Sequence, residues 1–279
     1  IRLKKPIGYM LLFWPCAWGL TLAYDFSDNL NIYIFYLLLF FLGSLFMRSA
    51  GCIINDIFDK EFDKKVRRTK NRPIASGKIS VFLGLIYSLI LCFAALLVLI
   101  NFNFFTILIA LISMPLAFTY PLMKRFTYWP QLFLGITFNY GLILGWTSIS
   151  GKLDIIPIIL YFGAIFWTLG YDTIYGYQDI KDDEIIGLKS TSIKFKKKPN
   201  LFVTLCYLIF ISTVLILGII MKFNFIFYVF LIVSCSHLFL YQIKNFKSDD
   251  PKICLKIFKS NNFFGFLIYL NILGGKIYI

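Results

Sequence analysis

Two clusters of acidic residues lie at the ends of two hydrophobic segments, at positions 55–63 and 172–183. On a helix, residues one or two turns apart share a face, so each cluster is expected to align its carboxylates as a stripe. Carboxylates crowded on one face repel one another unless a cation lies between them. The two stripes predicted in this way are Asn55, Asp59 and Asp63, and Asp172, Asp179 and Asp183.

The chemistry of these side chains points to a hard divalent cation. All the ligands offered are oxygen atoms, and neither Cys nor His stands within either cluster. Mg²⁺ suits such ligands and typically uses a few carboxylates together with phosphate oxygens. The sequence therefore predicts a metal-bridged diphosphate site at a membrane surface.

Basic residues follow the first cluster directly, in the segment 64–73, which includes Arg68 and Arg72. A metal-bridged diphosphate needs such bases for its remaining oxygens, and Arg can grip phosphate in a bidentate way. A solvated loop beside the membrane, with ion pairs four residues apart, accounts for the first cluster equally well on its own. The second stripe, on the same side of the membrane, favours the metal site.

Three further basic residues carry weaker signals. Lys124 and Arg125 follow Pro121 at the expected cytoplasmic end of a hydrophobic segment, where an ordinary positive-inside anchor is the simpler interpretation. Arg48 lies two helical turns before Asn55, and an ionisable residue inside a membrane helix indicates a function. Snorkelling towards the headgroups is the alternative interpretation of Arg48.

The elements that must position these residues are membrane helices. Of the 279 residues, 59% are hydrophobic, 19% are aromatic and only 15% are charged, a composition that predicts a polytopic, all-α membrane protein. We expect one domain over residues 1–279, with the first apolar run retained as a helix and a few residues preceding Ile1. The nine predicted helices lie near 7–24, 32–54, 81–100, 104–120, 132–149, 155–178, 200–220, 223–243 and 262–274.

The distribution of basic residues predicts the orientation. With the N-terminus in the cytoplasm, all of the 28 Lys and Arg residues lie at the cytoplasmic side except Lys152, Lys222 and Lys276, as the positive-inside rule requires. The net charge of +14 is therefore topological and indicates no nucleic-acid partner. Both acidic clusters end helices that run inward, so we expect them to share the cytoplasmic face.

The six cysteines contain no CxxC pair, and five of them lie within apolar runs. They are most simply small buried hydrophobic residues, without a disulfide or zinc signature. His237 is the only histidine, and without partners it favours a packed core role over catalysis.

Together these residues resemble the intramembrane aromatic prenyltransferases of the UbiA family, over essentially the whole chain. The Lys-Pro-Ile-Gly start at 5–8, the Met-Arg-x-Ala-Gly-Cys run at 47–52 and the Gly-x-Lys-Ser-Thr run at 187–191 point to the branch that prenylates 4-hydroxybenzoate. The other segments that carry the resemblance are Asn55-Asp56-x-x-Asp59-x-x-x-Asp63, Arg68-Thr69-x-Asn71-Arg72-Pro73, Tyr120-Pro121-x-x-Lys124-Arg125 and Asp172-Thr173-x-Tyr175-x-x-x-Asp179-x-x-x-Asp183.

The resemblance implies a helical bundle in which both acidic clusters face a central cavity. Mg²⁺ ions would bridge the diphosphate of a polyprenyl donor, whose tail leaves through a lateral opening into the bilayer, and 4-hydroxybenzoate would be the acceptor in a membrane step of ubiquinone biosynthesis. The expected location is a bacterial cell inner membrane. The implied metal ligands are Asn55, Asp56, Asp59, Asp63, Asp179 and Asp183.

The physical chemistry of prenyl transfer extends these roles. An allylic cation needs a dry, aromatic-rich pocket. The ring proton is expected to go either to a carboxylate of the acidic clusters, for which Asp172 is the candidate, or to the diphosphate itself. Arg48 and Tyr175 are further catalytic candidates, since Tyr175 lies between the acids of the second stripe and can donate a hydrogen bond. The residues expected to bind the diphosphate or the acceptor carboxylate are Arg68, Arg72, Tyr120, Lys124, Arg125 and Lys189.

Two alternatives stay open at this point. A prenyltransferase of the same family that acts on a naphthoate or haem acceptor would share the acidic clusters. A cation transporter or channel should instead place ionisable residues at mid-membrane along a through-path. Nearly all ionisable residues here fall at one face, which favours a one-sided enzyme.

Overall fold

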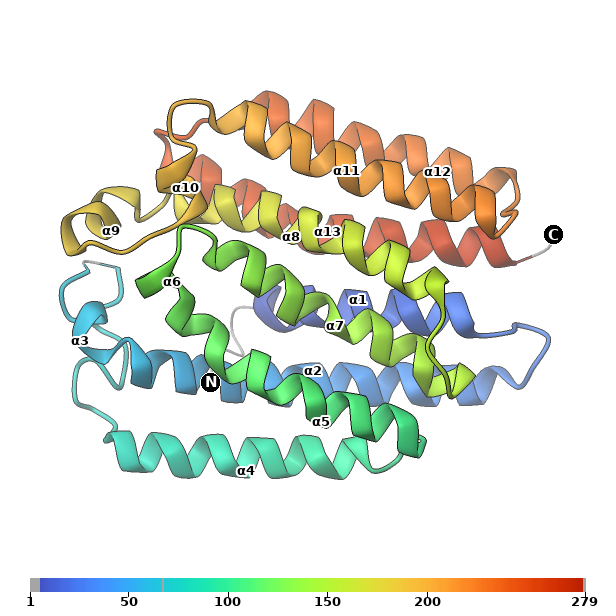
Figure 1. Cartoon of the computed structure of the whole chain (residues 1–279), viewed down its shortest axis with the longest axis horizontal. Helices are drawn as coiled ribbons and strands as arrows, with labels where there is room; N and C mark the ends of the chain where they lie inside the picture. The colour runs from blue at the N-terminus through green and yellow to red at the C-terminus, as the bar shows by residue number, and fades with distance from the viewer. Residues whose placement is uncertain (1–5, 67, 278–279) are drawn as a thin grey trace.

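The computed structural model describes residues 6–66 and 68–277, and these residues form a bundle of long helices (Figure 1). The all-helical membrane fold predicted from the composition is confirmed. The long helices are α1 (Ile7–Ala23), α2 (Leu30–Phe58), α4 (Val81–Leu99), α5 (Phe104–Thr119), α7 (Pro130–Ser150), α8 (Ile155–Gly176), α11 (Pro199–Ile220), α12 (Phe225–Ser236) and α13 (Pro251–Lys276).

Short helical segments gather at one end of this bundle. In Figure 1 they lie at the left, whereas the turns between α4 and α5 and between α7 and α8 lie at the right. The segments are α3 (Lys60–Asp63), the 3₁₀ turn η1 (Tyr120–Leu122), α6 (Met123–Phe126), α9 (Ile180–Ile186) and α10 (Thr191–Lys194). A π-helical stretch, η2 (His237–Ile243), continues α12.

Seven helical segments of the described chain are long and apolar enough to cross a membrane. Helix α1 is apolar but has only 17 residues, and the first half of α13 carries Lys252, Lys256 and Lys259. The predicted count of nine spans is therefore not confirmed. The predicted start of the last helix near residue 262 is wrong, because Asp250 caps α13 one residue before Pro251 and the Lys-rich first half hides its hydrophobic pattern.

Polar side chains begin many of the helices. Asn29, Ser80, Asn103, Asp154 and Asn224 each accept a hydrogen bond from a backbone N–H in the first turn of the helix that follows. Such caps satisfy donors that have no partner within the helix. The chain can therefore end one apolar run and start the next within a few residues.

Helices α1 and α7 cross at very short range. A Cβ at Gly19 would lie 1.9 Å from the backbone oxygen of Leu142, and one at Gly145 would lie 2.2 Å from that of Cys16. Small residues that let two backbones approach are the usual means of association between membrane helices. This crossing fixes α1 at the centre of the bundle, where it also packs against α2 and α13.

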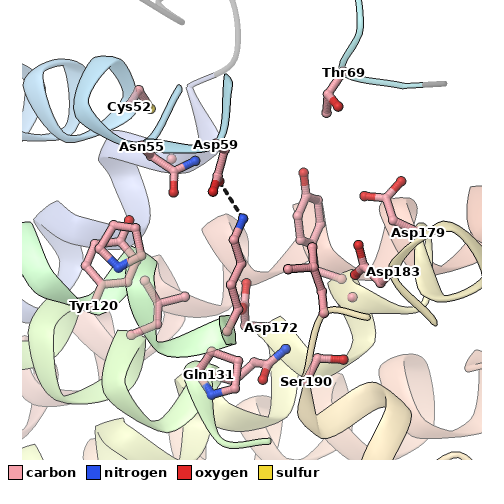
Figure 2. Close-up of a pocket in the computed structure, with 18 of the residues that line it drawn as sticks. Cys52, Asn55, Asp59, Thr69, Tyr120, Gln131, Asp172, Asp179, Asp183 and Ser190 are labelled. Atoms are coloured by element: carbon pink, nitrogen blue, oxygen red, sulfur yellow. Dashed lines mark hydrogen bonds and ion pairs between the residues drawn. The ribbon is translucent and has the colours of Figure 1, made fainter. Parts of the chain in front are cut away.

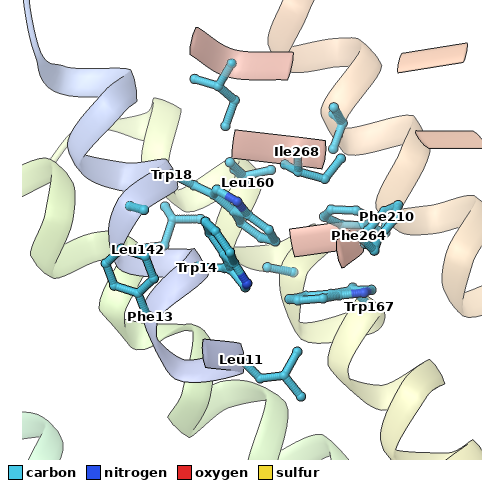
Figure 3. Packing of buried hydrophobic residues seen from close by; sticks show 14 of the residues in the cluster. Leu11, Phe13, Trp14, Trp18, Leu142, Leu160, Trp167, Phe210, Phe264 and Ile268 are labelled. Atoms are coloured by element: carbon cyan, nitrogen blue, oxygen red, sulfur yellow. The ribbon is translucent and has the colours of Figure 1, made fainter. Parts of the chain in front are cut away.

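Aromatic residues fill the core beside α1 (Figure 3). The rings of Trp18 and Trp167 lie 5.1 Å apart between centroids, and Phe210 and Phe264 pack against Trp167. The indole N–H of Trp167 donates to Asn261 Oδ1 at 2.9 Å. The core thus ties α1, α8, α11 and α13 together.

Candidate active site

A cavity of about 330 Å³ opens at the end of the bundle that carries the short helices. It is lined by residues of α1, α2, α7, α8 and α13 and by the segments between them. The cavity gathers most of the side chains singled out in the sequence, namely Arg48, Asn55, Asp59, Asp63, Arg68, Arg72, Tyr120, Lys124, Asp172, Tyr175, Asp179, Asp183 and Lys189.

The first acidic cluster lies where α2 ends. Asp59 is the residue after the last turn of α2, with its backbone N–H bonded to Asn55 O at 2.9 Å. Its side chain is buried and pairs through Oδ2 with the ammonium of Lys124. The other oxygen, Oδ1, is buried without a hydrogen-bond partner, an arrangement that costs free energy unless a ligand satisfies it.

The second cluster lies across the cavity from the first (Figure 2). The prediction that Asp172, Asp179 and Asp183 share one helical face is wrong, because α8 ends at Gly176 and Asp179 is the N-cap of the separate helix α9. The turn between the helices nevertheless keeps all three side chains at the cavity. The break lies at residues 177–179, between the end of α8 and the start of α9, and the spacing of the acids does not reveal it.

Arg68 bridges the two halves of the site. Its Nε lies 2.8 Å from Asp179 Oδ1, and its Nη1 donates to the Tyr175 hydroxyl at 3.2 Å. Its guanidinium also lies over the Tyr175 ring, 5.7 Å from the centroid. A cation from the loop after α3 therefore holds a carboxylate at the start of α9.

Arg72 forms a second set of ion pairs behind the first cluster. Its Nη1 lies 2.7 Å from Asp63 Oδ2 and 3.1 Å from Asp56 Oδ1. Asp56 is thereby held against Arg72 rather than in the cavity lining, unlike the other predicted metal ligands. The pairing orients Asp63 at the cavity wall.

Burial governs the second cluster's electrostatics. Burial, and after it the neighbouring Asp179 carboxylate, raises the pKa of Asp183 to about 6, while Lys124 and Arg68 oppose the rise. Two carboxylates this close favour a cation between them. The site thus combines concentrated negative charge with basic side chains paired to it.

The donor set fits Mg²⁺. Within residues 6–66 and 68–277, no group of three or more Asp, Glu, His or Cys side chains is arranged to hold a metal ion by itself. Open carboxylates on two walls, with the unpaired Oδ1 of Asp59 among them, instead leave coordination positions for substrate oxygens. Mg²⁺ is usually bound in this way, through one or two carboxylates plus phosphate.

The inner end of the cavity holds a buried cation, Arg48. Arg48 Nε is buried and has no hydrogen-bond partner, and the guanidinium carbon lies 5.2 Å from the centroid of the Phe138 ring. The charge of Arg48 interacts with Asp172 and with the Tyr120 hydroxyl. An anionic or polar group of a ligand would find an available donor here.

The structure places Arg125 elsewhere. Its Nη2 donates to the backbone oxygen of Phe58 at 2.6 Å, and its guanidinium lies over the Phe62 ring. It does not line the cavity, although Lys124 beside it does. Lys189 stands at the mouth, where its backbone N–H donates to Lys124 O at 2.9 Å.

Among the cavity residues without a role predicted from the sequence are Gln131 and Thr69. Gln131 is the second residue of α7, and its side-chain oxygen accepts from the backbone N–H of Thr191 at 3.0 Å, which ties α7 to α10. Thr69 is buried, and its hydroxyl donates to Asp63 O at 3.0 Å. For Gln131, the sequence did contain a signal: a polar residue within the first turn of an otherwise apolar helix.

The fold and the cavity define a class: a polytopic membrane protein with an acidic and basic site, suited to a metal-bound anion, at one end of the bundle. The model of the UbiA prenyltransferase family matches residues 12–268. The chain belongs to this family.

Relatives with assigned names match over nearly the whole chain. It is 41% identical to 4-hydroxybenzoate geranyltransferase 2 of Lithospermum erythrorhizon, over 99% of this chain and 89% of that protein. It is 41% identical to mitochondrial 4-hydroxybenzoate polyprenyltransferase of Rattus norvegicus, over 100% of this chain and 74% of that protein. The human mitochondrial protein of the same name is 40% identical, with the same coverage of both chains.

Solved structures share the fold. A UbiA homologue from Archaeoglobus fulgidus, described as bound to GPP and Mg²⁺, superposes with a TM-score of 0.73 at 18% identity, covering 98% of this chain and 96% of that one. The apo structure of a homologue from Aeropyrum pernix gives a TM-score of 0.70 at 21% identity, over 94% of this chain and 98% of that one.

Proposed function

We propose that this protein transfers a prenyl group from a polyprenyl diphosphate to the ring of 4-hydroxybenzoate, ortho to the hydroxyl. The observation that carries the proposal is the pairing of Asp59 with Lys124 and of Asp179 with Arg68 on two walls of one cavity. Carboxylates for a metal and cations for phosphate thus stand together. The names of the relatives at 40–41% identity support the choice of acceptor.

The carboxylates on the two walls would hold the metal. Asn55 and Asp59, with Asp63 nearby, supply oxygen atoms from one side, and Asp179 and Asp183 supply them from the other. When bound, Mg²⁺ neutralises the negative charge that develops on a diphosphate leaving group. The homologue from Archaeoglobus fulgidus, whose structure is described as bound to GPP and Mg²⁺, has the same fold, and this supports the assignment.

The basic side chains would hold the donor's remaining phosphate oxygens. Lys124 and Arg68 are paired with Asp59 and Asp179, two of the carboxylates that would hold the metal, so both cations would be available for phosphate oxygens in the loaded site. Arg72 and Lys189 line the same cavity. Preorganised positive charge of this kind stabilises the transition state of a departing anion.

The aromatic residues near the second cluster suit an allylic cation. The rings of Tyr175 and Phe258 lie 4.3 Å apart between centroids, and both residues line the cavity. Aromatic faces attract a cation through their quadrupole. A cavity within the bundle also limits attack by water on that cation.

The inner end of the cavity would orient the acceptor. We assign the carboxylate of 4-hydroxybenzoate to Arg48, whose Nε lacks a partner. In the reaction, the C–O bond of the allylic diphosphate breaks and the ring carbon ortho to the hydroxyl forms a C–C bond to the prenyl carbon. Asp172 accepts the proton that this ring carbon loses, and diphosphate leaves with the electron pair of the broken bond.

We also propose that the site faces the compartment that retains the basic loops. The segments that surround the cavity mouth carry most of the Lys and Arg residues, and such segments stay on the inner side of the membrane. In a bacterial cell this side is the cytoplasm. The tail of the donor would remain in the bilayer.

The test is a direct assay of the purified protein. Incubation with Mg²⁺, a polyprenyl diphosphate and 4-hydroxybenzoate should yield the prenylated acid, detected by mass spectrometry, and EDTA should abolish the product. A dihydroxynaphthoate acceptor, offered in parallel, should react poorly because it places its carboxylate differently relative to the attacking carbon. Faster reaction with the naphthoate, or product formation undiminished by EDTA, would overturn the proposal.

A further inference from the structure

Tyr171 is a buried tyrosine of the acidic cavity that belongs to neither acidic cluster. It lies on α8, one turn before Tyr175, and only 1% of its surface is exposed. Within the described residues, its hydroxyl is buried and makes no hydrogen bond. A buried hydroxyl without a partner costs free energy, so this atom is explained if a ligand of the cavity satisfies it.

The Tyr171 side chain points towards the inner end of the cavity. Side chains on a helix lean towards its N-terminus, and α8 runs towards the cavity mouth, so the ring of Tyr171 is directed away from the mouth. The ring accordingly packs against Trp167, which lies one turn earlier on α8. The hydroxyl of Thr168, at the same depth, is engaged by Asn139 Nδ2 at 2.7 Å.

Arg48 supplies a second buried donor at the inner end. Its charge and that of Asp172 both act on the Tyr171 hydroxyl, and all three residues line the cavity. In the described part of the chain, Arg48 Nε is likewise buried without an acceptor. One N–H from α2 and one O–H from α8 thus lack acceptors in the same region of the cavity.

A chain of buried polar side chains holds Tyr171 in place through Trp167. The two rings meet edge to face, 4.9 Å apart between centroids, and the indole N–H of Trp167 donates to Asn261 Oδ1 at 2.9 Å. Asn261 Oδ1 also accepts from Gln242 Nε2 at 3.2 Å, and Gln242 Oε1 accepts from the Tyr207 hydroxyl at 2.7 Å. The partner of the Tyr171 ring is therefore fixed by α11, η2 and α13 together.

The backbone beneath Tyr171 is equally constrained. A Cβ at Gly170 would lie 2.5 Å from Tyr207 Cε1, so α8 and α11 meet closely beside Tyr171. Gln242 lies in the π-helical stretch η2, and such stretches are frequent at functional sites. The free hydroxyl is therefore held on a rigid part of the bundle, as ligand-binding side chains usually are.

We propose that Tyr171 is a second donor to the carboxylate of the acceptor, so that its hydroxyl and Arg48 Nε each bind one carboxylate oxygen. The proposal rests on the proposed function, because it takes 4-hydroxybenzoate as the acceptor and Arg48 as the first donor. Two donors on different helices determine the rotation of the acceptor ring as well as its position. Tyr171 thereby makes the site specific for a phenol that carries a carboxylate.

Tyr171→Phe tests this role, because it removes the hydroxyl and keeps the ring. The KM for 4-hydroxybenzoate should rise about tenfold or more, as expected for a hydrogen bond to a charged group, and the KM for the donor should stay constant. With phenol, which has no carboxylate, the variant and the wild type should differ less than about twofold. An equal loss with both acceptors, or no change with 4-hydroxybenzoate, would overturn the proposal.

Tyr177→Phe is the matched control. Among the described residues, the Tyr177 hydroxyl is also buried without a hydrogen-bond partner, but Tyr177 does not line the cavity. Its loss should leave the KM values of both substrates unchanged. A similar rise in the KM for 4-hydroxybenzoate in both variants would mean that loss of a buried hydroxyl loosens the bundle, and would refute the assignment.

Thermal unfolding without ligands distinguishes binding from a structural role. The oxygen that Tyr171→Phe removes makes no hydrogen bond in the part of the chain that the structure describes, so the Tm of the variant should equal or exceed that of the wild type. Addition of 4-hydroxybenzoate should raise the Tm of the wild type more than that of the variant. A lower Tm of the ligand-free variant would show that the hydroxyl supports the fold.

A binding measurement separates this inference from the proposed function. Calorimetry with 4-hydroxybenzoate, with and without Mg²⁺ and inorganic pyrophosphate, should show affinity about tenfold or more lower in Tyr171→Phe, and phenol should bind both proteins equally. If the wild type makes no prenylated product, the proposed function fails, while this carboxylate-dependent difference still supports Tyr171 as a donor. Equal affinity of both proteins for 4-hydroxybenzoate, or no binding to the wild type under either condition, would refute the proposal even in an active enzyme.

Discussion

Asp59 presents one carboxylate oxygen to Lys124 and leaves the other buried and unpaired. Across the cavity, the Nε–H of Arg68 is shared between the two carboxylate oxygens of Asp179, with Nε 2.8 Å from Oδ1 and 2.9 Å from Oδ2. At the scale of single residues, the proposed metal site depends most on Asp59 and Asp179. Their conversion to amides keeps size and shape and removes one ligand charge.

We expect Asp59→Asn and Asp179→Asn each to lower prenyl transfer by roughly a hundredfold or more at limiting Mg²⁺, since metal and charge stabilisation of the leaving group is lost. The measurement is turnover in detergent, with circular dichroism and size exclusion to verify folding. Asp28→Asn, in an exposed turn, is the control. Activity near the wild-type level in either cavity variant would rule out a metal held between the two clusters.

The assignment of the acceptor carboxylate to Arg48 leads to a different prediction. Arg48→Gln should raise KM for 4-hydroxybenzoate roughly thirtyfold, equivalent to about 2 kcal/mol for a hydrogen bond to a charged group. The KM of the donor should stay nearly constant. With phenol, which has no carboxylate, the variant and the wild type should differ little, and an equal loss with both acceptors would refute the assignment.

Gly8 sets the position of that arginine. A Cβ at residue 8 would lie 2.9 Å from Arg48 Nε, closer than side chains normally approach, so the guanidinium must shift in Gly8→Ala. We expect the KM for 4-hydroxybenzoate to rise about fivefold, a smaller effect than loss of the hydrogen bond itself. The measurement is steady-state kinetics with both substrates varied, and a change confined to the donor would contradict this role.

At the scale of elements, the site depends on where two helices stop. Helix α2 ends at Phe58, so that Asp59 caps it, and α8 ends at Gly176, so that Asp179 begins α9. The loop after α3 brings Arg68 back across the cavity to Asp179. Without a metal, the basic residues of these connecting segments therefore satisfy the acids.

Arg68→Gln should consequently affect two ligands in opposite directions. In the absence of diphosphate, the variant should bind Mn²⁺ more tightly, because the cation that competes for Asp179 has been removed. The gain in affinity should be only about threefold, because Arg68 is partly exposed and exposed ion pairs are weak. Binding of a prenyl diphosphate should weaken, because a phosphate donor is missing. Titration followed by electron paramagnetic resonance of Mn²⁺ and by calorimetry measures both.

Arg125→Gln is the control for this pair of measurements, since Arg125 is a similar cation outside the cavity lining. It should change neither affinity. A parallel loss of both ligands in Arg68→Gln would mean that Arg68 supports the loop rather than competing for Asp179.

The sequence could predict which residues lie at the site, but it could not predict their individual contacts there. Spacing at helical turns and charge at one face led to Asp59, Asp179 and Lys124, because charged side chains are costly beside apolar membrane segments and are usually functional there. For two adjacent basic residues, the sequence does not show which one points into the cavity. Lys124 and Arg125 are both basic, yet the four-residue helix α6 sends one into the cavity and the other to Phe58 O.

The element boundaries show the same limit. Apolar runs predicted α4 within one residue of its observed bounds, Val81–Leu99, whereas the charged start of α13 escaped detection. Open space beside a glycine could not be predicted at all. Gly51 and Gly19 look alike in the sequence, but one adjoins open space and the other touches α7, a difference that only the packing of distant segments creates.

At the scale of the whole molecule, the residues of the acidic cavity lie at the end of the bundle that carries the short helices α3, α6, α9 and α10 (Figure 1). The loop that contains Lys70 lies at this end, and the turn that contains Lys152 lies at the other, between α7 and α8. Both positions are exposed. They can therefore report which face of the membrane each end occupies.

The sidedness prediction uses single cysteines in a background in which the six natural cysteines are replaced by Ala. We first expect this background, with or without His237→Ala, to retain prenyl transfer, because none of these residues belongs to the proposed metal ligands. His237 packs against Phe264 at 5.8 Å between ring centroids, so its loss is expected to affect stability more than turnover. A folded but inactive background would contradict the oxygen-only metal site.

In that background, Lys70→Cys should react with a membrane-impermeant thiol reagent only in inside-out vesicles, and Lys152→Cys only in right-side-out cells or spheroplasts, because basic loops stay inside. Mg²⁺ with a prenyl diphosphate should slow labelling at position 70 several-fold, since this loop carries Arg68 and Arg72 to the head group, and leave position 152 unchanged. Protection at position 70 ties the inner face to the site itself. The reverse pattern of labelling would place both acidic clusters on the outer face. Labelling of both positions from the same side would mean that the bundle does not span the bilayer as its helices indicate.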